Sequence, residues 1–211
     1  MLMHLFTKDA SNNSYFMKNL LVLSIFILAS NLQAQHMELP YHQIPDYPED
    51  YGSGNVVARM IDGLGFRFYW ATEGLTQKDL DYKVSEDGRT IFETLQHIYG
   101  MSEMIKNAPE SKPNVRPMNL SELTYKDLRE GTLKNLQAAS QAMAGATADD
   151  FKDFKVIFQR GENQTPYPYW NMINGMLSDC IYHAGQITMM RRASGNPINP
   201  KVSVFNGRLR E

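Results

Sequence analysis

The chain has 211 residues, of which 43% are hydrophobic and 21% charged, and its formal net charge is −2. This composition is typical of a globular protein with one main domain, and it excludes collagen-like, coiled-coil-only and largely disordered chains. With 21 basic and 23 acidic residues, there is no electrostatic reason to expect a nucleic-acid partner, because phosphate binding needs a basic patch or stripe. The single cysteine, Cys180, excludes an intrachain disulfide and any multi-cysteine metal site.

Residues 1–34 are expected to be a secretory signal peptide. Lys18 is followed by an apolar run over residues 20–29 and then by small residues suited to cleavage, which is the layout of such a peptide. The run is shorter than the roughly 20 apolar residues of a membrane span, so we expect export to the periplasm or the exterior without stable membrane insertion. A retained anchoring helix is the alternative. Met17 stands where a signal peptide would begin, so residues 1–16 could reflect a mis-assigned start codon.

The segment after the expected cleavage site, residues 35–53, is predicted to be an extended arm. It contains Pro40, Pro45 and Pro48, and proline at such intervals blocks both helix and sheet hydrogen bonding.

Four segments beyond the arm have apolar residues at steps of three and four, which places these residues on one helix face. The expected helices cover about residues 55–75, 90–107, 121–145 and 168–194. Thr124 with Asp127 three residues later resembles a capping pair, and Gly195 suits the position just past the last helix. Residues 154–158 could be a short strand or an irregular segment.

Four substantial helices with little strand predict an all-α fold, a four-helix bundle over residues 54–200. A loose tail is expected over residues 201–211. Cys180, inside the last helix, is expected to be a small buried hydrophobic residue.

Three residues could hold a metal ion inside this bundle. Asp179 and His183 are four residues apart, so both side chains lie on one helix face. His97 from a facing helix would complete three ligands, and two imidazoles with one carboxylate suit zinc, nickel or iron. Three protein ligands leave a position open for water or substrate. Spacing alone leaves the alternatives open that Asp179 and His183 are an ordinary polar pair and that His97 is an interior histidine.

The sequence around His183 resembles the last helix of the DinB/YfiT-like superfamily. Residues 179–187 read Asp-Cys-Ile-Tyr-His-Ala-Gly-Gln-Ile, and an arginine-containing helix end and a glycine follow. Residues 90–98, Thr-Ile-Phe-Glu-Thr-Leu-Gln-His-Ile, resemble the family segment that carries its first histidine. With the helix order and the proline-rich link, the resemblance covers about residues 56–197.

This resemblance implies a four-helix bundle that holds a metal ion with three histidines. The three positions map onto His97, Asp179 and His183, so Asp179 stands where the common pattern has histidine. The implied protein is an exported DinB-like metal-binding protein with a divalent ion, zinc first and nickel or iron as alternatives. It would act as a metal-dependent enzyme of the hydrolase or transferase type on an unidentified small molecule.

The alternative function is a non-catalytic binding module with a vestigial metal site. Bundles of this kind often pair through exposed helix faces, so a homodimer is also an open expectation.

Two further residues are candidate catalytic residues. Gln186 lies one turn beyond the second histidine and could hydrogen-bond a metal-bound water or orient a ligand; a helix-packing amide is the alternative. Glu93 lies one turn before the first histidine and could support that ligand or act as a general base, although a solvated helix charge is the interpretation we favour. Arg191 and Arg192 could bind an anionic substrate, but compensation of the helix dipole is the interpretation preferred here.

Overall fold

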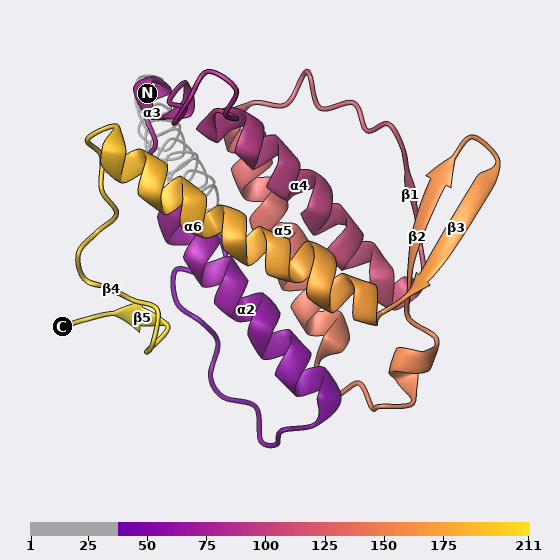
Figure 1. Cartoon of the computed structure of the whole chain (residues 1–211). Coiled ribbons are helices and arrows are strands. Elements are labelled where there is room, and N and C mark those ends of the chain that lie inside the picture. Colours follow the sequence, from indigo (N-terminus) through magenta and orange to yellow (C-terminus); the bar gives the residue numbers. More distant parts are fainter. Residues whose placement is uncertain (1–37) are drawn as a thin grey trace, which may run out of the picture. The chain divides into compact units, whose positions relative to one another are not determined.

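The computed structural model describes residues 38–211, so the expected signal peptide, its cleavage site and the first residues of the arm lie outside the described residues. Four long helices dominate this part of the chain (Figure 1). They are α2 (Ser53–Thr72), α4 (Ile91–Asn107), α5 (Tyr125–Met143) and α6 (Ser178–Ala193). Helices α5 and α6 each pack against both α2 and α4, and the result is a four-helix bundle. Within the described residues, no helix has the length and apolarity that crossing a lipid bilayer requires.

The bundle is held together by the apolar faces that the periodicity predicts. The largest fully buried side chains come from α2, α4 and α5: Ile61, Leu64, Phe66, Phe68, Ile91, Leu95, Ile98, Ile105, Leu128, Leu133, Leu136 and Met143. Burying one such side chain contributes about 1.5–3 kcal/mol. Cys180 of α6 is also fully buried, as expected, and burial raises the pKa of its thiol.

The helix ends follow the capping rules. The Thr124 backbone N–H donates to Asp127 Oδ2 at 2.9 Å, and the Thr124 hydroxyl accepts from the Asp127 backbone N–H at 3.2 Å, so the predicted capping pair is confirmed. Gly195 follows Ser194, the C-cap residue of α6, and has a φ of +101°. This backbone conformation favours glycine.

The structure is mainly helical, but it is not all-α. Strand β1 (Pro113–Val115) pairs in parallel with β2 (Lys155–Arg160), and β2 pairs antiparallel with β3 (Asn163–Pro168). The strand alternative at 154–158 is therefore correct. The expected helix start at Pro168 is wrong, because Pro168 ends the edge strand β3, where a residue without an N–H is tolerated. A π-helical stretch, η3 (Met172–Leu177), leads into α6.

Shorter elements connect and close the bundle. They are α3 (Gln77–Leu80), the 3₁₀ turns η1 (Ala108–Glu110) and η2 (Asp150–Lys152), and strands β4 (Val202–Ser203) and β5 (Arg208–Leu209). The expectation of a loose tail over residues 201–211 is wrong, because β4 and β5 pair as a hairpin in this segment.

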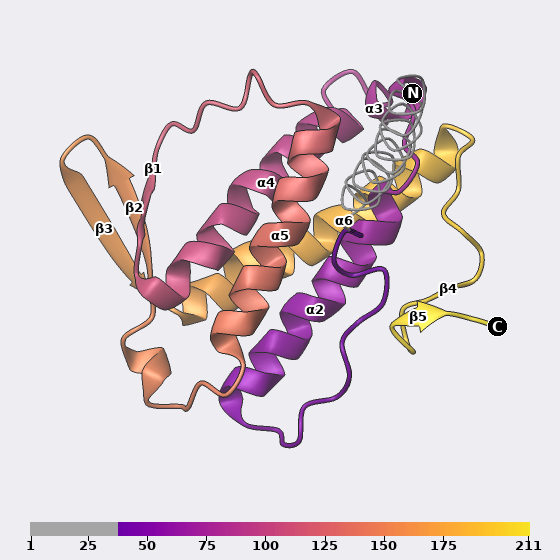
Figure 2. The same ribbon diagram turned by 180° about the vertical axis from the view of Figure 1, so that it is seen from behind.

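The arm packs against α2 and joins the C-terminal hairpin (Figure 2). The Ile44 N–H donates to the Gly207 carbonyl at 2.8 Å. The Trp70 indole N–H donates to the His42 carbonyl at 3.1 Å, and the Tyr41 hydroxyl donates to Asp62 at 3.0 Å. The two ends of the described chain are thus fixed to each other and to the bundle.

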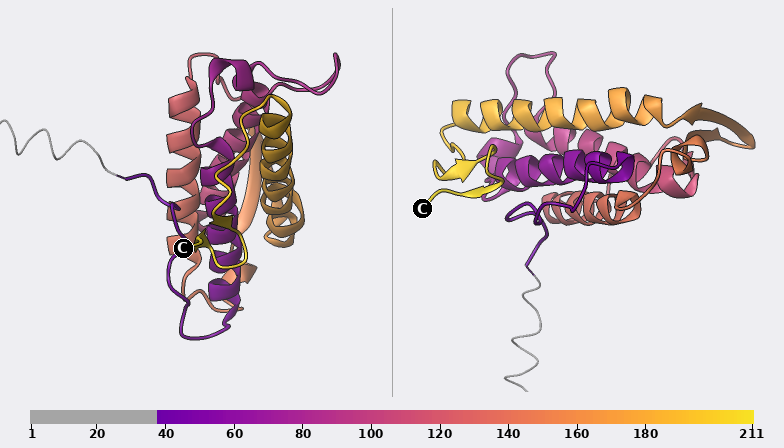
Figure 3. Two further views of the ribbon diagram at one scale, coloured as in Figure 1. Left: turned by 90° about the vertical axis from the view of Figure 1, so that its left-hand side faces the viewer. Right: turned by 90° about the horizontal axis from the view of Figure 1, so that it is seen from below.

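Arg191 fastens α6 to the C-terminal end of α2. Its side chain is 3% exposed, and its Nη1 donates to the carbonyls of Trp70, Ala71 and Glu73 at 3.0, 3.2 and 2.9 Å. These carbonyls have no helical partner because α2 ends there. Arg191 therefore compensates the dipole of the neighbouring helix, in addition to lying in the last turn of its own. Figure 3 shows α6 lying on one side of the other three long helices.

We expect Arg191→Ala to lower the free energy of unfolding by about 3 kcal/mol, because several charge-assisted hydrogen bonds are lost and buried carbonyls are left without donors. Arg192→Ala is the matched control: Arg192 is exposed, and its removal should change stability by no more than about 0.5 kcal/mol. Urea unfolding followed by circular dichroism measures both. Equal losses in the two variants would contradict the capping role.

Candidate metal centre

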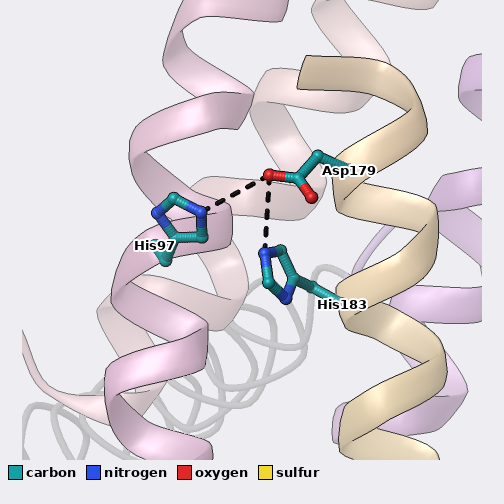
Figure 4. A group of neighbouring side chains, drawn as sticks. All are labelled: His97, Asp179 and His183. Atoms are coloured by element: carbon teal, nitrogen blue, oxygen red, sulfur yellow. Dashed lines mark ion pairs between the residues drawn. The ribbon is translucent and has the colours of Figure 1, made fainter. Parts of the chain in front are cut away.

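Three candidate ligands converge between two packed helices. His97 projects from α4, while Asp179 and His183 project from successive turns of α6 (Figure 4). The distance from His97 Nε2 to Asp179 Oδ2 is 3.6 Å, and that from His183 Nε2 to the same oxygen is 3.5 Å. One donor atom from each residue lies within 4.8 Å of the other two. The group could therefore hold a metal ion.

These separations fit a shared ion better than they fit direct hydrogen bonds. An N–H···O bond spans at most about 3.2 Å, and both distances exceed it. Two atoms bound about 2.1 Å from one tetrahedral ion lie about 3.4 Å apart, close to both values. Two imidazole nitrogens and a carboxylate oxygen are also a ligand set typical of zinc and of first-row transition metals. The residues present thus fit a divalent ion in their chemistry and in two of the three separations, while the third is bounded only by the 4.8 Å within which all three donor atoms lie.

Gln186 sets the orientation of His183. The Nδ1 of His183 lies 2.6 Å from Gln186 Oε1, and an amide oxygen can only accept, so Nδ1 carries the proton in this arrangement. The lone pair of the neutral ring is then on Nε2, the atom that faces Asp179. A hydrogen bond on the far nitrogen is how proteins fix the tautomer of a metal-binding histidine. Gln186 thus contacts the candidate metal ligand His183 directly.

The environment of His97 favours its neutral form. Burial, followed by the charge of Arg89 and the neighbouring His183, lowers the pKa of His97, while Asp179 acts in the opposite direction. A metal ligand must offer an unprotonated nitrogen, so the lowered pKa reduces proton competition at this position. The rings of His97 and His183 meet edge to face with centroids 4.8 Å apart.

Glu93 lies on α4 one turn before His97, but its carboxylate is engaged elsewhere. Its Oε2 accepts from the Thr90 backbone N–H at 2.8 Å and from the Thr90 hydroxyl at 3.1 Å. These bonds hold the pKa of Glu93 below its usual range. The side chain therefore closes the capping box at the start of α4, and within the described residues neither a hydrogen bond nor an ion pair joins it to the three candidate ligands.

Two cavities open beside the three ligands. One, of about 800 Å³, includes His97, Arg116 and Arg160 in its lining. The other, of about 710 Å³, includes His183, Gln186 and Arg89. The side chain of Asp179 is 46% exposed, so the centre is accessible to small molecules. None of these three arginines was among the residues singled out from the sequence, because nothing in their local spacing distinguishes them.

The π-helical stretch η3 ends one residue before α6, and Asp179 is the second residue of that helix. Short π-helical segments occur frequently at functional sites. A sequence read with a period of 3.6 residues does not reveal this irregularity.

Three solved structures share this architecture. A DinB-like protein from Bacillus subtilis aligns over 72% of this chain and 99% of its own, with 13% identity and a TM-score of 0.52. YfiT from Bacillus subtilis, described as a probable metal-dependent hydrolase with an unusual four-helix-bundle topology, aligns over 72% and 93%, with 17% identity and a TM-score of 0.51. The chain has the DinB/YfiT-like fold.

A third match extends this fold assignment. A DinB-like protein from Bacillus cereus aligns over 70% of this chain and 97% of its own, with 16% identity and a TM-score of 0.50. At these identities the DinB/YfiT likeness establishes the fold alone. No protein-family model matches the chain, and no curated protein matches it by sequence.

We expect Gln186→Leu to weaken zinc binding by about 10–100-fold, the usual cost of removing the hydrogen-bond partner of a metal ligand. Gln164→Leu is the control, because Gln164 lies in β3 and, within residues 38–211, its side chain bonds only to Gln159. Competition with a chromogenic chelator gives the affinities. Unchanged affinity in Gln186→Leu would show that the amide does not orient His183.

Proposed function

We propose that this chain is an exported protein that binds one divalent metal ion through His97, Asp179 and His183 and acts as a metal-dependent hydrolase on a small molecule. Zinc is the first candidate, with nickel or iron as alternatives. The observation that carries the proposal is the spacing of the donor atoms, 3.5 and 3.6 Å from a common carboxylate oxygen. The likeness to YfiT supports the reaction class.

The chemistry of such a centre follows from its ligand set. A divalent ion held here would supply Lewis-acid activation of a substrate oxygen and of water. Three protein ligands leave at least one coordination position open, and the cavities beside His97 and His183 give access to it. A hydrolase is favoured over a thiol-dependent transferase because a cytosolic thiol co-substrate fits an exported protein poorly.

The other candidate residues take different roles. Gln186 acts as a positioning residue, because it holds the His183 ring through Nδ1. Glu93 would have to leave its capping bonds with Thr90 to act as a base. We therefore assign Glu93 to the stability of α4.

The metal content of the purified protein tests the centre directly. We expect about one equivalent of a divalent metal by elemental analysis, and a loss of affinity of at least about tenfold in His97→Ala and Asp179→Asn. His42→Ala is the control, since His42 lies in the arm and its ring packs against Tyr69 and Trp70 of α2. A wild-type protein that binds neither zinc, nickel nor iron on reconstitution would refute the metal centre and favour a non-catalytic binding module.

Turnover separates an enzyme from a metal-storage protein. The zinc-loaded protein should hydrolyse at least one member of a panel of ester, amide and phosphoester substrates, with Asp179→Asn as the background. Turnover that requires an added thiol would identify a transferase instead, and full metal occupancy without turnover would contradict the hydrolase.

Export rests on the pattern of Lys18, the apolar run at 20–29 and the small residues after it. N-terminal sequencing of the protein from its native host should begin at Gln35. An intact Met1 or Met17 at the N-terminus would argue against cleavage.

A further inference from the structure

The cavity on the His97 side contains a pair of arginines that the proposed metal centre does not use. Arg116 follows β1 directly, and Arg160 is the last residue of β2. The two strands are parallel, with Val115 opposite Gln159, and the Arg116 N–H donates to the Gln159 carbonyl at 2.8 Å. This register places the next residues of the two strands, the two arginines, beside each other.

Within residues 38–211, neither guanidinium has a side-chain hydrogen bond or an ion pair, although other arginines of the chain do: Arg129 pairs with Glu73. Like charges placed side by side on adjacent strands are destabilising. No carboxylate lines this cavity among the described residues. Arg116 is partly buried, and this burial lowers the pKa of its guanidinium. An anion would relieve both the repulsion and the cost of burial.

The position of Arg116 connects it to the metal centre. A Cβ placed on Gly100 would lie 3.7 Å from Arg116 Nη1, so the guanidinium lies over this glycine. Gly100 is three residues after His97, on the same face of α4. The remaining walls of the cavity include four apolar side chains, Met101, Met104, Leu120 and Phe158. One hollow therefore combines a candidate metal ligand, an apolar wall and two unpaired cations.

We propose that Arg116, assisted by Arg160, binds the anionic end of the substrate, which is a small molecule with an apolar body and a carboxylate or phosphate group. This inference rests on the proposed metal-dependent function for the reacting end of the substrate. The anion site itself depends only on the two arginines. A planar guanidinium can donate two parallel hydrogen bonds to a carboxylate or phosphate. In a chain of net charge −2, this local positive charge also attracts anions toward the centre.

The test compares ligands that share an apolar body and differ in charge: hexanoate, hexyl phosphate and uncharged hexanamide. Each is titrated into the metal-free and the zinc-loaded full-length protein, and the Nε–Hε signals of the arginines are followed by NMR. We expect hexanoate or hexyl phosphate to bind about tenfold more tightly than hexanamide, as one charge-assisted pair allows, and to shift the Arg116 signal. Whichever of hexanoate and hexyl phosphate binds more tightly shows whether the site prefers a carboxylate or a phosphate group.

Arg116→Gln should abolish this preference, and Arg116→Lys should retain part of it because charge remains but the paired donors are lost. Arg208→Gln makes the same charge change in β5, away from this cavity, and should behave as wild type. Arg116→Gln should still bind zinc as wild type does. Equal binding of the anions and hexanamide, or a preference that survives Arg116→Gln, would overturn the anion site. If zinc fails to bind, the proposed function falls, while the metal-free titration still decides the anion site.

Discussion

The attachment of α6 to the C-terminal end of α2 is the contact on which the candidate centre depends. Asp179 and His183 belong to α6, whereas His97 belongs to α4, so the three donors meet only if α6 is correctly placed along the bundle. Arg191 fixes that placement, because its guanidinium bonds to three carbonyls at the end of α2. Because the three carbonyls lie together at the end of α2, moving α6 along α2 would break these hydrogen bonds. One buried cation thus helps to set the position of two ligands that lie about two and three turns away on the same helix.

Much of the fold can be predicted from the sequence because the signals for helices lie in residues close together in the chain. The apolar period, the Thr124–Asp127 cap and Gly195 all concern neighbours within four residues, and the structure contains each of them. The same holds for Asp179 and His183, whose spacing places them on one face. Their convergence with His97 is non-local, and the resemblance to the DinB/YfiT-like superfamily supplied what spacing alone left open.

The features missed from the sequence are those decided by distant partners. The pairing of β1 with β2 joins residues more than forty positions apart, and this pairing makes Pro113–Val115 a strand. From the sequence, Arg191 is an ordinary cation in the last turn of its helix. Its hydrogen bond to the carbonyl of Trp70, 121 residues earlier, is a tertiary contact. Glu93 is a local exception: the sequence favours a solvated helix charge over a general base, but its carboxylate accepts hydrogen bonds from Thr90, three residues earlier. In each case a tertiary or capping contact outweighs the local pattern.

The junction between the arm and the C-terminal hairpin has a consequence for when this fold can be completed. Ile44 bonds to Gly207, so the first and last parts of the domain meet. Gly207 follows all four bundle helices in the chain, the last of which is α6 (Ser178–Ala193). The arm therefore cannot form this contact until the last bundle helix has been synthesised.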